Sequence, residues 1–325
     1  MRQTNKIRKG IAWLLCTVLV LGILPMLPQM SMQISAAENA ASVFVDGVEL
    51  HAGGKEYFKN GDTADSGATG TYEDHSAYYD TAGELWLNNL EAHTIKANGN
   101  LTIYVCNNQA TNTNIVTATQ NETAIEVTGY LTIRYGGYGG GTGSLTVESD
   151  GKEAIQAGSG MTVSDGVEVK ARAKSGATAI SSGGVLKIDG IRTKLEAAGD
   201  GSTGKGIFAQ QSIYVKNSAV LTAFGGAAYE SPSGIDKSGY GYEDYNVFTG
   251  DAAPGTQAAK DTVLDGYKYI RIEPTGVANV KTLTELQAAA QNQYISLINV
   301  MNDITITDTV YVRRAVTIQS PDASN

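Results

Sequence analysis

The chain has 325 residues, a formal net charge of −9 and only two cysteines. An acidic chain with dispersed Lys and Arg is a poor partner for nucleic-acid phosphates, and two cysteines exclude a disulfide-rich scaffold. Thirty-eight glycines against six prolines, without a strict glycine period, exclude collagen and favour short strands separated by tight turns.

The first 37 residues have the pattern of a secretory signal peptide. Four basic residues precede an apolar stretch at residues 11–27, and the small residues Ser35-Ala36-Ala37 follow. The apolar stretch is shorter than the roughly 20 residues that span a bilayer, so we predict cleavage after Ala37 and no membrane span after processing. Cleavage would lower the net charge from −9 to −13 and leave Cys106 as the one cysteine. The sequence therefore predicts an extracellular protein, either secreted or associated with the cell wall.

A repeat of 25 to 30 residues runs through the middle of the chain. Each repeat contains a tripeptide in which two apolar residues flank a more polar one, and an isoleucine precedes each of the last four tripeptides by six residues. The tripeptides are Leu101-Thr102-Ile103, Leu131-Thr132-Ile133, Met161-Thr162-Val163, Leu186-Lys187-Ile188 and Ile213-Tyr214-Val215; the isoleucines are Ile125, Ile155, Ile180 and Ile207.

This repeat predicts an all-β fold, a right-handed parallel β-helix over residues 38–274. A third alternating segment follows each of the last four tripeptides, as in Leu145-Thr146-Val147. Because alternate side chains of a strand point to opposite faces, stacked turns of three strands bury the apolar set in one column. Two other all-β folds fit this repeat less well. A β-propeller would need about 40 residues per blade. An antiparallel sandwich gives no reason for the constant spacing between each isoleucine and its tripeptide.

A hairpin is predicted before the repeat. Val43-Phe44-Val45 and Val48-Glu49-Leu50 flank Asp46-Gly47, a strong two-residue turn signal. We expect this hairpin to cover the open N-terminal end of the β-helix, which would otherwise expose a strand edge. Residues 53–72 are predicted to form a loop, and residues 84–89 the first turn of the helix.

Residues 275–325 are predicted to begin a second β-helix that is incomplete. Residues 274–278 read as a linker, and the capping-box pattern from Thr282 to Glu285 predicts a helix at residues 283–291. Strands are expected around Ile295 and at residues 304–306, 310–312 and 316–318.

The rungs resemble a known group of proteins. Tyr79-Asp80-x3-Glu84-Leu85-Trp86-Leu87-Asn88-Asn89, followed by Gly99-Asn100-Leu101-Thr102-Ile103, is similar to the β-helix carbohydrate-binding domains of clostridial surface proteins, which share the pectate-lyase-like fold. The resemblance covers residues 43–274. It implies calcium-assisted binding of acidic plant polysaccharide without strong lyase activity, and it carries over no individual ligand residue.

Candidate ligand-binding residues lie near a glycine-rich bend at residues 136–143. Tyr135 and Tyr138 could stack on sugar rings, although a bend that lengthens one turn is the more ordinary explanation of them. Arg134 and Arg172 are candidate partners for a glycan carboxyl group. They are also, with Arg192 and Lys187, candidate bases of a lyase, a role that requires a lowered pKa.

Calcium is the predicted cofactor, if there is one. Each candidate aspartate precedes a glycine, and Asp-Gly pairs are also preferred in ordinary turns. The candidates are Asp150, Asp165, Asp189 and Asp200.

Three functions remain open at this stage. The first is a non-catalytic module that binds a polysaccharide, an acidic plant or cell-wall glycan; the others are an adhesin stalk and a polysaccharide lyase. An aligned row of Tyr, Arg and Asp on one face would favour binding. A carboxylate pair facing an arginine in a groove would favour an enzyme, and a bare Thr and Asn face would favour a stalk.

Overall fold

The computed structural model describes residues 38–320 except 54–55, 72, 107–112, 120, 138–141 and 313. The predicted signal peptide and Tyr138 therefore lie outside the described residues. The described chain consists of short strands, one 3-10 turn, η1 (Ser238–Tyr240), and one α-helix. No helix in these ranges is long and apolar enough to cross a lipid bilayer.

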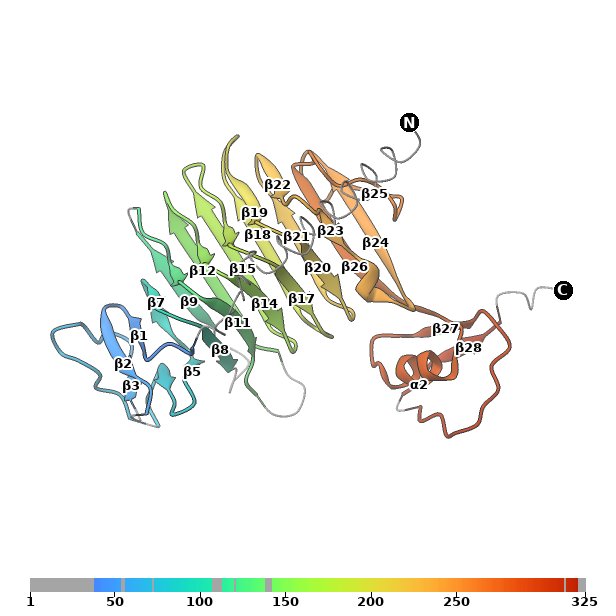
Figure 1. Cartoon of the computed structure of the whole chain (residues 1–325), viewed down its shortest axis with the longest axis horizontal. Helices are drawn as coiled ribbons and strands as arrows, with labels where there is room; N and C mark the ends of the chain where they lie inside the picture. The colour runs from blue at the N-terminus through green and yellow to red at the C-terminus, as the bar shows by residue number, and fades with distance from the viewer. Residues whose placement is uncertain are drawn as a thin grey trace, which may run out of the picture. The chain divides into compact units, whose positions relative to one another are not determined.

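Most strands belong to three sheets whose central strands are parallel, and together they form a parallel β-helix (Figure 1). The first sheet has the order β2 (Val48–His51), β1 (Ser42–Val45), β7 (Ile95–Ala97), β10 (Ile125–Val127), β13 (Ile155–Ala157), β16 (Ile180–Ser182), β19 (Lys205–Ala209) and β22 (Ala227–Glu230). The second has the order β23 (Ile235–Asp236), β20 (Ile213–Lys216), β17 (Leu186–Asp189), β14 (Gly160–Ser164), β11 (Tyr130–Tyr135), β8 (Leu101–Cys106), β5 (Glu84–Asn88), β4 (Ala77–Tyr79) and β3 (Glu56–Phe58). The third has the order β25 (Thr256–Ala258), β24 (Glu243–Gly250), β26 (Tyr269–Val280), β21 (Val220–Phe224), β18 (Lys194–Gly199), β15 (Glu168–Lys174), β12 (Ser144–Asp150), β9 (Asn114–Ala118) and β6 (Glu91–Ala92).

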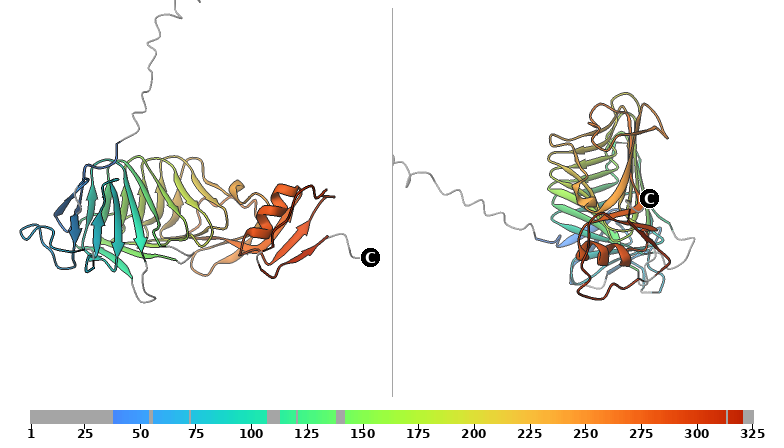
Figure 2. Two further views of the ribbon diagram at one scale, coloured as in Figure 1. Left: turned by 90° about the horizontal axis from the view of Figure 1, so that it is seen from below. Right: turned by 90° about the vertical axis from the view of Figure 1, so that its right-hand side faces the viewer.

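The register between coils is the one that the repeat predicts. Each tripeptide pairs residue for residue with the next, so Leu131 lies between Leu101 and Met161 in the second sheet. The isoleucines that precede the tripeptides stack in the first sheet in the same way. All of these apolar residues are buried in one continuous core, and the coils are stacked along its length (Figure 2).

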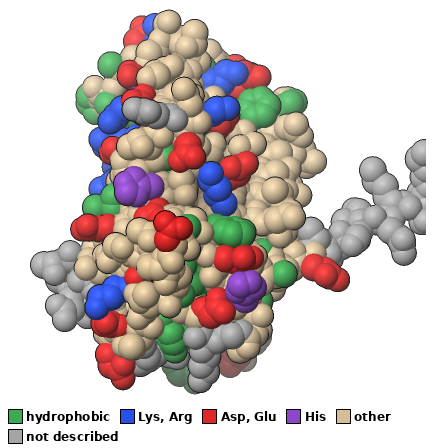
Figure 3. Space-filling model, turned by 90° about the vertical axis from the view of Figure 1, so that its left-hand side faces the viewer, with side chains coloured by type: hydrophobic (Ala, Val, Ile, Leu, Met, Phe, Trp, Pro, Cys, Tyr) green, Lys and Arg blue, Asp and Glu red, His purple; other side chains and the backbone are tan. Residues whose placement is uncertain are grey.

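An antiparallel cap covers the N-terminal end. β1 and β2 form the predicted hairpin, and Asp46 and Gly47 both have positive φ, as a tight primed turn requires. β1 then pairs antiparallel with β7, while β3 and β4 add two antiparallel strands to β5. β3 lies inside the predicted loop at residues 53–72; it forms because Phe58 is fully buried in the core. Asp and Glu side chains are spread over the surface of this end (Figure 3).

At the C-terminal end of the β-helix, antiparallel pairing closes the third sheet. β26 pairs antiparallel with both β21 and β24, and it continues without a break through residues 274–278. The linker predicted there is therefore wrong. Pairing with β24 and with β27 holds this segment extended, and such pairing between distant segments leaves no local sign in the sequence.

A second, smaller core lies beyond β26. The predicted helix is confirmed as α2 (Leu283–Gln291), and both hydrogen bonds of its capping box are present. β27 (Leu297–Val300) pairs in parallel with β26 and with β28 (Thr317–Gln319). Residues 304–306 and 310–312 do not form the predicted strands, and Ile306 and Tyr311 remain exposed. The start of a second β-helix stays a prediction for this segment.

A buried carboxyl group joins the two cores. Glu243 on β24 accepts hydrogen bonds from Ser218 Oγ at 2.9 Å and from Asn292 Nδ2 at 2.8 Å, and Asn292 is the C-cap of α2. The second oxygen of Glu243, Oε2, is buried without a hydrogen-bond partner. Burial outweighs the two hydrogen bonds and raises the pKa of Glu243 above its ordinary value of 4.5.

The substitution Glu243→Gln tests this ionisation. A carboxyl group with a raised folded-state pKa contributes stability at low pH, and this contribution is lost as the pH rises through the folded-state value. Between pH 4.5 and pH 7 we expect the wild-type chain to lose about 1.4 kcal/mol for each unit of pKa elevation, a loss that the Gln variant lacks. Urea denaturation of both proteins at both pH values measures it; identical pH dependence would contradict the assignment.

Candidate functional site

The outer surface of the second sheet carries the clearest ordered arrangement of polar and aromatic side chains. We call the outward side chains of β5, β8, β11, β14, β17 and β20 the ladder face. Because the coils are in register, these side chains form two columns with one residue per coil. The first column is Trp86, Tyr104, Arg134, Ser164, Asp189 and Lys216, and the second is Glu84, Thr102, Thr132, Thr162, Lys187 and Tyr214.

Trp86, Tyr104 and Arg134 form a stack within the first column. The rings of Trp86 and Tyr104 are nearly parallel, at an interplanar angle of 7°, with centroids 4.2 Å apart. The guanidinium carbon of Arg134 lies 5.3 Å from the centroid of the Tyr104 ring. Aromatic stacking and cation–π attraction therefore hold three successive coils together on this face. Because Trp86 and Arg134 both pack on Tyr104, the stack presents mainly ring edges and polar groups to solvent.

Acidic side chains fix the polar ends of both rings. Trp86 Nε1 donates to Asp80 Oδ2 at 3.0 Å, and Tyr104 OH donates to Glu84 Oε1 at 3.2 Å. Asp80 is itself held by the backbone N–H groups of Ala82 and Glu84, each at 2.9 Å. Partial burial of the stacked ring raises the pKa of Tyr104. The hydrogen-bonding groups of the stack are thus ordered before any ligand arrives.

The aromatic row extends onto the cap. Tyr78 on β4 is in register with Trp86, and its ring stacks on that of Tyr57 at 4.9 Å. Tyr57 lies opposite Tyr78 on β3. The aromatic part of the first column therefore continues onto the cap.

The other half of the ladder face is charged. Arg134 Nη2 lies 2.6 Å from Asp165 Oδ2. Further along, Asp189 contacts Lys187 at 2.7 Å and Lys216 at 3.9 Å and accepts a hydrogen bond from Asn217 Nδ2 at 2.6 Å. Partial burial alone would raise the pKa of Asp189, but the Lys187 and Asn217 hydrogen bonds outweigh it and lower that pKa. The hydrogen bond to Asp189 raises the pKa of Lys187.

The structure separates the residues that the sequence grouped as ligand-binding. Arg134 lies on the ladder face, but Tyr135 is in register with the buried Val105 and packs against the core. Tyr138 is outside the described residues. Arg172 lies on the third sheet, where its Nη2 is 3.2 Å from Glu196 Oε1.

The four candidate calcium aspartates are also separated. In the second sheet, Asp165 follows β14 and Asp189 is the last residue of β17. In the third sheet, Asp150 is the last residue of β12 and Asp200 follows β18. Asp150 accepts a hydrogen bond from Ser175 Oγ at 2.6 Å, and Asp200 accepts one from the Gly201 N–H at 2.7 Å. In the described part of the chain no three His, Cys, Asp or Glu residues are grouped for metal binding. The four aspartates therefore lie on two sheets and not at one site.

Sequence reasoning missed Trp86 and Tyr104 as site residues. The sequence does contain a signal for Tyr104. Tyr104 and Arg134 lie three positions after Leu101 and Leu131, the first residues of their tripeptides. Residues in the same phase of a repeat meet in one column, so the repeat predicts this pair. Trp86 belongs to a coil without the tripeptide spacing, and only the β5–β8 pairing places it.

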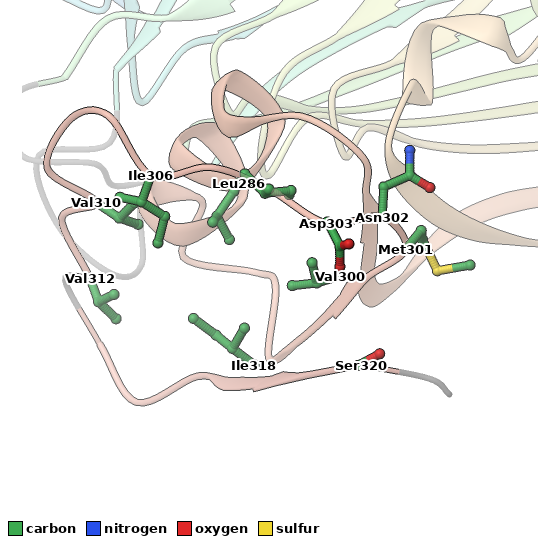
Figure 4. Close-up of a pocket in the computed structure, with 11 residues that line it drawn as sticks. Leu286, Val300, Met301, Asn302, Asp303, Ile306, Val310, Val312, Ile318 and Ser320 are labelled. Carbon is green, nitrogen blue, oxygen red and sulfur yellow. The ribbon is translucent and has the colours of Figure 1, made fainter. Parts of the chain in front are cut away.

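A further hollow lies away from the ladder face. About 680 Å³ lies between α2 and the segment around β27 and β28. Figure 4 shows the aliphatic side chains of Leu286, Ile306, Val310, Val312 and Ile318 around this space. With few polar groups to orient a ligand, this hollow is uncovered apolar core, not a polar binding site.

Comparison with known protein families, with curated proteins and with solved structures finds no match to the chain.

A double-mutant cycle measures the stack. Trp86→Ala and Tyr104→Ala should each destabilise the protein, and their effects should be non-additive by about 1 kcal/mol because each removes the same ring contact. Urea denaturation of the two single variants and the double variant gives this coupling. A matched cycle between Trp86 and the distant Tyr214 should be additive; equal coupling in both cycles would argue against stacking.

Proposed function

We propose that this protein is a secreted or cell-surface module that binds a linear acidic polysaccharide along the ladder face without cleaving it. The observation that carries the proposal is the stack of Trp86, Tyr104 and Arg134 beside a column of threonines, with one residue of each column on every coil. This is the aligned aromatic and charged row that favours binding over a plain stalk.

The spacing between successive coils within each column supports a polymeric ligand. Neighbouring strands lie about 4.8 Å apart, which is close to the length of one sugar residue in an extended chain. A polysaccharide parallel to the stacking direction would meet a similar set of groups at each coil. Thr102, Thr132 and Thr162 supply partly exposed hydroxyl groups at this repeat.

The cations of the face support an acidic glycan. Arg134, Lys187 and Lys216 lie on three different coils, and their side chains are 41%, 34% and 31% exposed. Asp165, the partner of Arg134, has a side chain that is 48% exposed, so a glycan carboxylate can replace it at Arg134 without a buried charge being left unpaired. A guanidinium can also bind a carboxylate through two parallel hydrogen bonds.

The protonation of these cations favours binding over lyase chemistry. A lyase base must lose its proton near neutral pH, which requires a lowered pKa. The pKa of Lys187 is raised by Asp189, the opposite direction. The Arg134 guanidinium is ion-paired with Asp165, a geometry that suits recognition of a carboxylate.

Arg134→Gln should weaken binding to polygalacturonate about tenfold, because it removes one charge-assisted hydrogen bond of about 1.5 kcal/mol or more. Affinity-gel retardation measures the change, with a parallel assay for unsaturated product, of which we expect none. Lys174→Gln is the matched control, since it removes an exposed, ion-paired cation from the third sheet. Equal weakening by both substitutions would indicate nonspecific attraction, and steady product release would indicate a lyase.

Trp86 provides a direct probe of the face, because it is the one tryptophan between residues 38 and 325. Polygalacturonate should change the Trp86 emission saturably in the 38–325 chain, and added salt should weaken the effect by screening the cations. The same titration with calcium or with chelator measures the predicted calcium requirement. An unchanged emission up to saturating polymer, together with no gel retardation, would favour the stalk.

A further inference from the structure

We propose that a groove on the third sheet is a second saccharide site, one that binds a neutral oligosaccharide. The groove has a volume of about 570 Å³, within the range of small-ligand sites. We call it the β21 groove, because Thr222 of β21 lies on its floor between side chains of β18 and β26.

The groove follows from the sizes of side chains in register. Glu196 on β18, Thr222 on β21 and Arg271 on β26 lie side by side on the same outer surface. Thr222 is short and its two neighbours are long, and the next outward residue of β21, Val220, is short as well. The floor along β21 is therefore lower than the walls formed by β18 and β26.

The charges of the walls are paired with one another. Glu168 lies 3.7 Å from Lys194, Glu196 lies 3.2 Å from Arg172, and Glu273 pairs with Arg271. A carboxylate or guanidinium in such a pair keeps further lone pairs or N–H groups for the hydroxyls of a sugar. The Nε atom of Arg271 is buried and has no partner, so one donor of the wall is still unsatisfied.

The ion pairs of the groove favour a neutral ligand. Each of its three glutamates already has a cation partner: Glu168 has Lys170 and Lys194, Glu196 has Arg172, and Glu273 has Arg271. The glutamate side chains are only 24% to 31% exposed, so a uronate that took one of these cations would leave a partly buried carboxylate unpaired. A neutral sugar offers hydroxyls to both signs of charge and breaks no ion pair. This preference is opposite to that proposed for the ladder face.

One end of the groove is aromatic. Phe224 and Tyr269 are in register on neighbouring strands, and Ala253 approaches from the segment between β24 and β25. Phe224 is partly exposed, while Tyr269 is buried and supports it. An apolar surface beside convergent polar groups matches a pyranose, which has C–H faces and hydroxyl edges. Because this site lies on another sheet, it does not depend on the ladder face.

Thr222→Trp tests the site by filling the floor of the groove. The ligands are cellohexaose, xylohexaose and mannohexaose, titrated separately into the 38–325 chain by calorimetry. We expect saturable binding of at least one, and a loss of about tenfold or more in the variant. Thr146→Trp is the matched control, because Thr146 lies in the same row of the same sheet, outside the groove.

Two further measurements separate this proposal from the first. Thr222→Trp should leave polygalacturonate retardation unchanged, and the neutral oligosaccharide should not alter Trp86 emission in the wild-type chain. Phe224→Ala, which empties the aromatic end, should weaken oligosaccharide binding even if the larger substitution impairs folding. Binding of none of the three oligosaccharides, or equal binding by wild type and both groove variants, would overturn the β21 groove as a saccharide site.

Discussion

The residue-for-residue register between successive coils is the constraint on which the rest of this structure depends. A shift of one residue in any coil would turn its apolar side chains outward, because side chains alternate along a strand. Leu131, Ile133 and their equivalents are fully buried only because every coil keeps the same phase. The same register pairs the backbone of each central strand with two neighbours, so the hydrophobic core and the hydrogen-bond ladders stabilise one arrangement together.

Register also creates the surfaces. An outward residue on one coil must stand beside its counterpart on the next, at the strand spacing. Tyr104 therefore meets Trp86 on one side and Arg134 on the other, and Thr132 lies between Thr102 and Thr162. The groove on the third sheet has the same origin, since short Thr222 lies between long Glu196 and Arg271. Flat columns suit a polymer, whereas a groove suits a short ligand, so one rule of assembly yields two kinds of surface.

The ends obey different rules from the middle. A parallel stack leaves an unpaired edge at each end, and here antiparallel strands cover part of both: β1 and β4 cap the first and second sheets at one end, and β26 caps the third sheet at the other. The second closure brings β24 and α2 together and buries Glu243 between them. A partly unsatisfied carboxyl group at this junction costs stability, which is consistent with its raised pKa.

Sequence alone determined the coils, because a repeat with period-two alternation specifies both the inward residues and the pairing of each coil with the next. It also determined the hairpin at Asp46-Gly47 and the helix capped by Thr282, since both signals are local. Tertiary structure alone decided that Trp86 joins the column of Tyr104, that Tyr135 turns to the core, and that residues 274–278 are strand. It also created the groove beside β26. These features depend on pairing between segments far apart in the chain or outside the repeat, where no local pattern records which strand will be the neighbour.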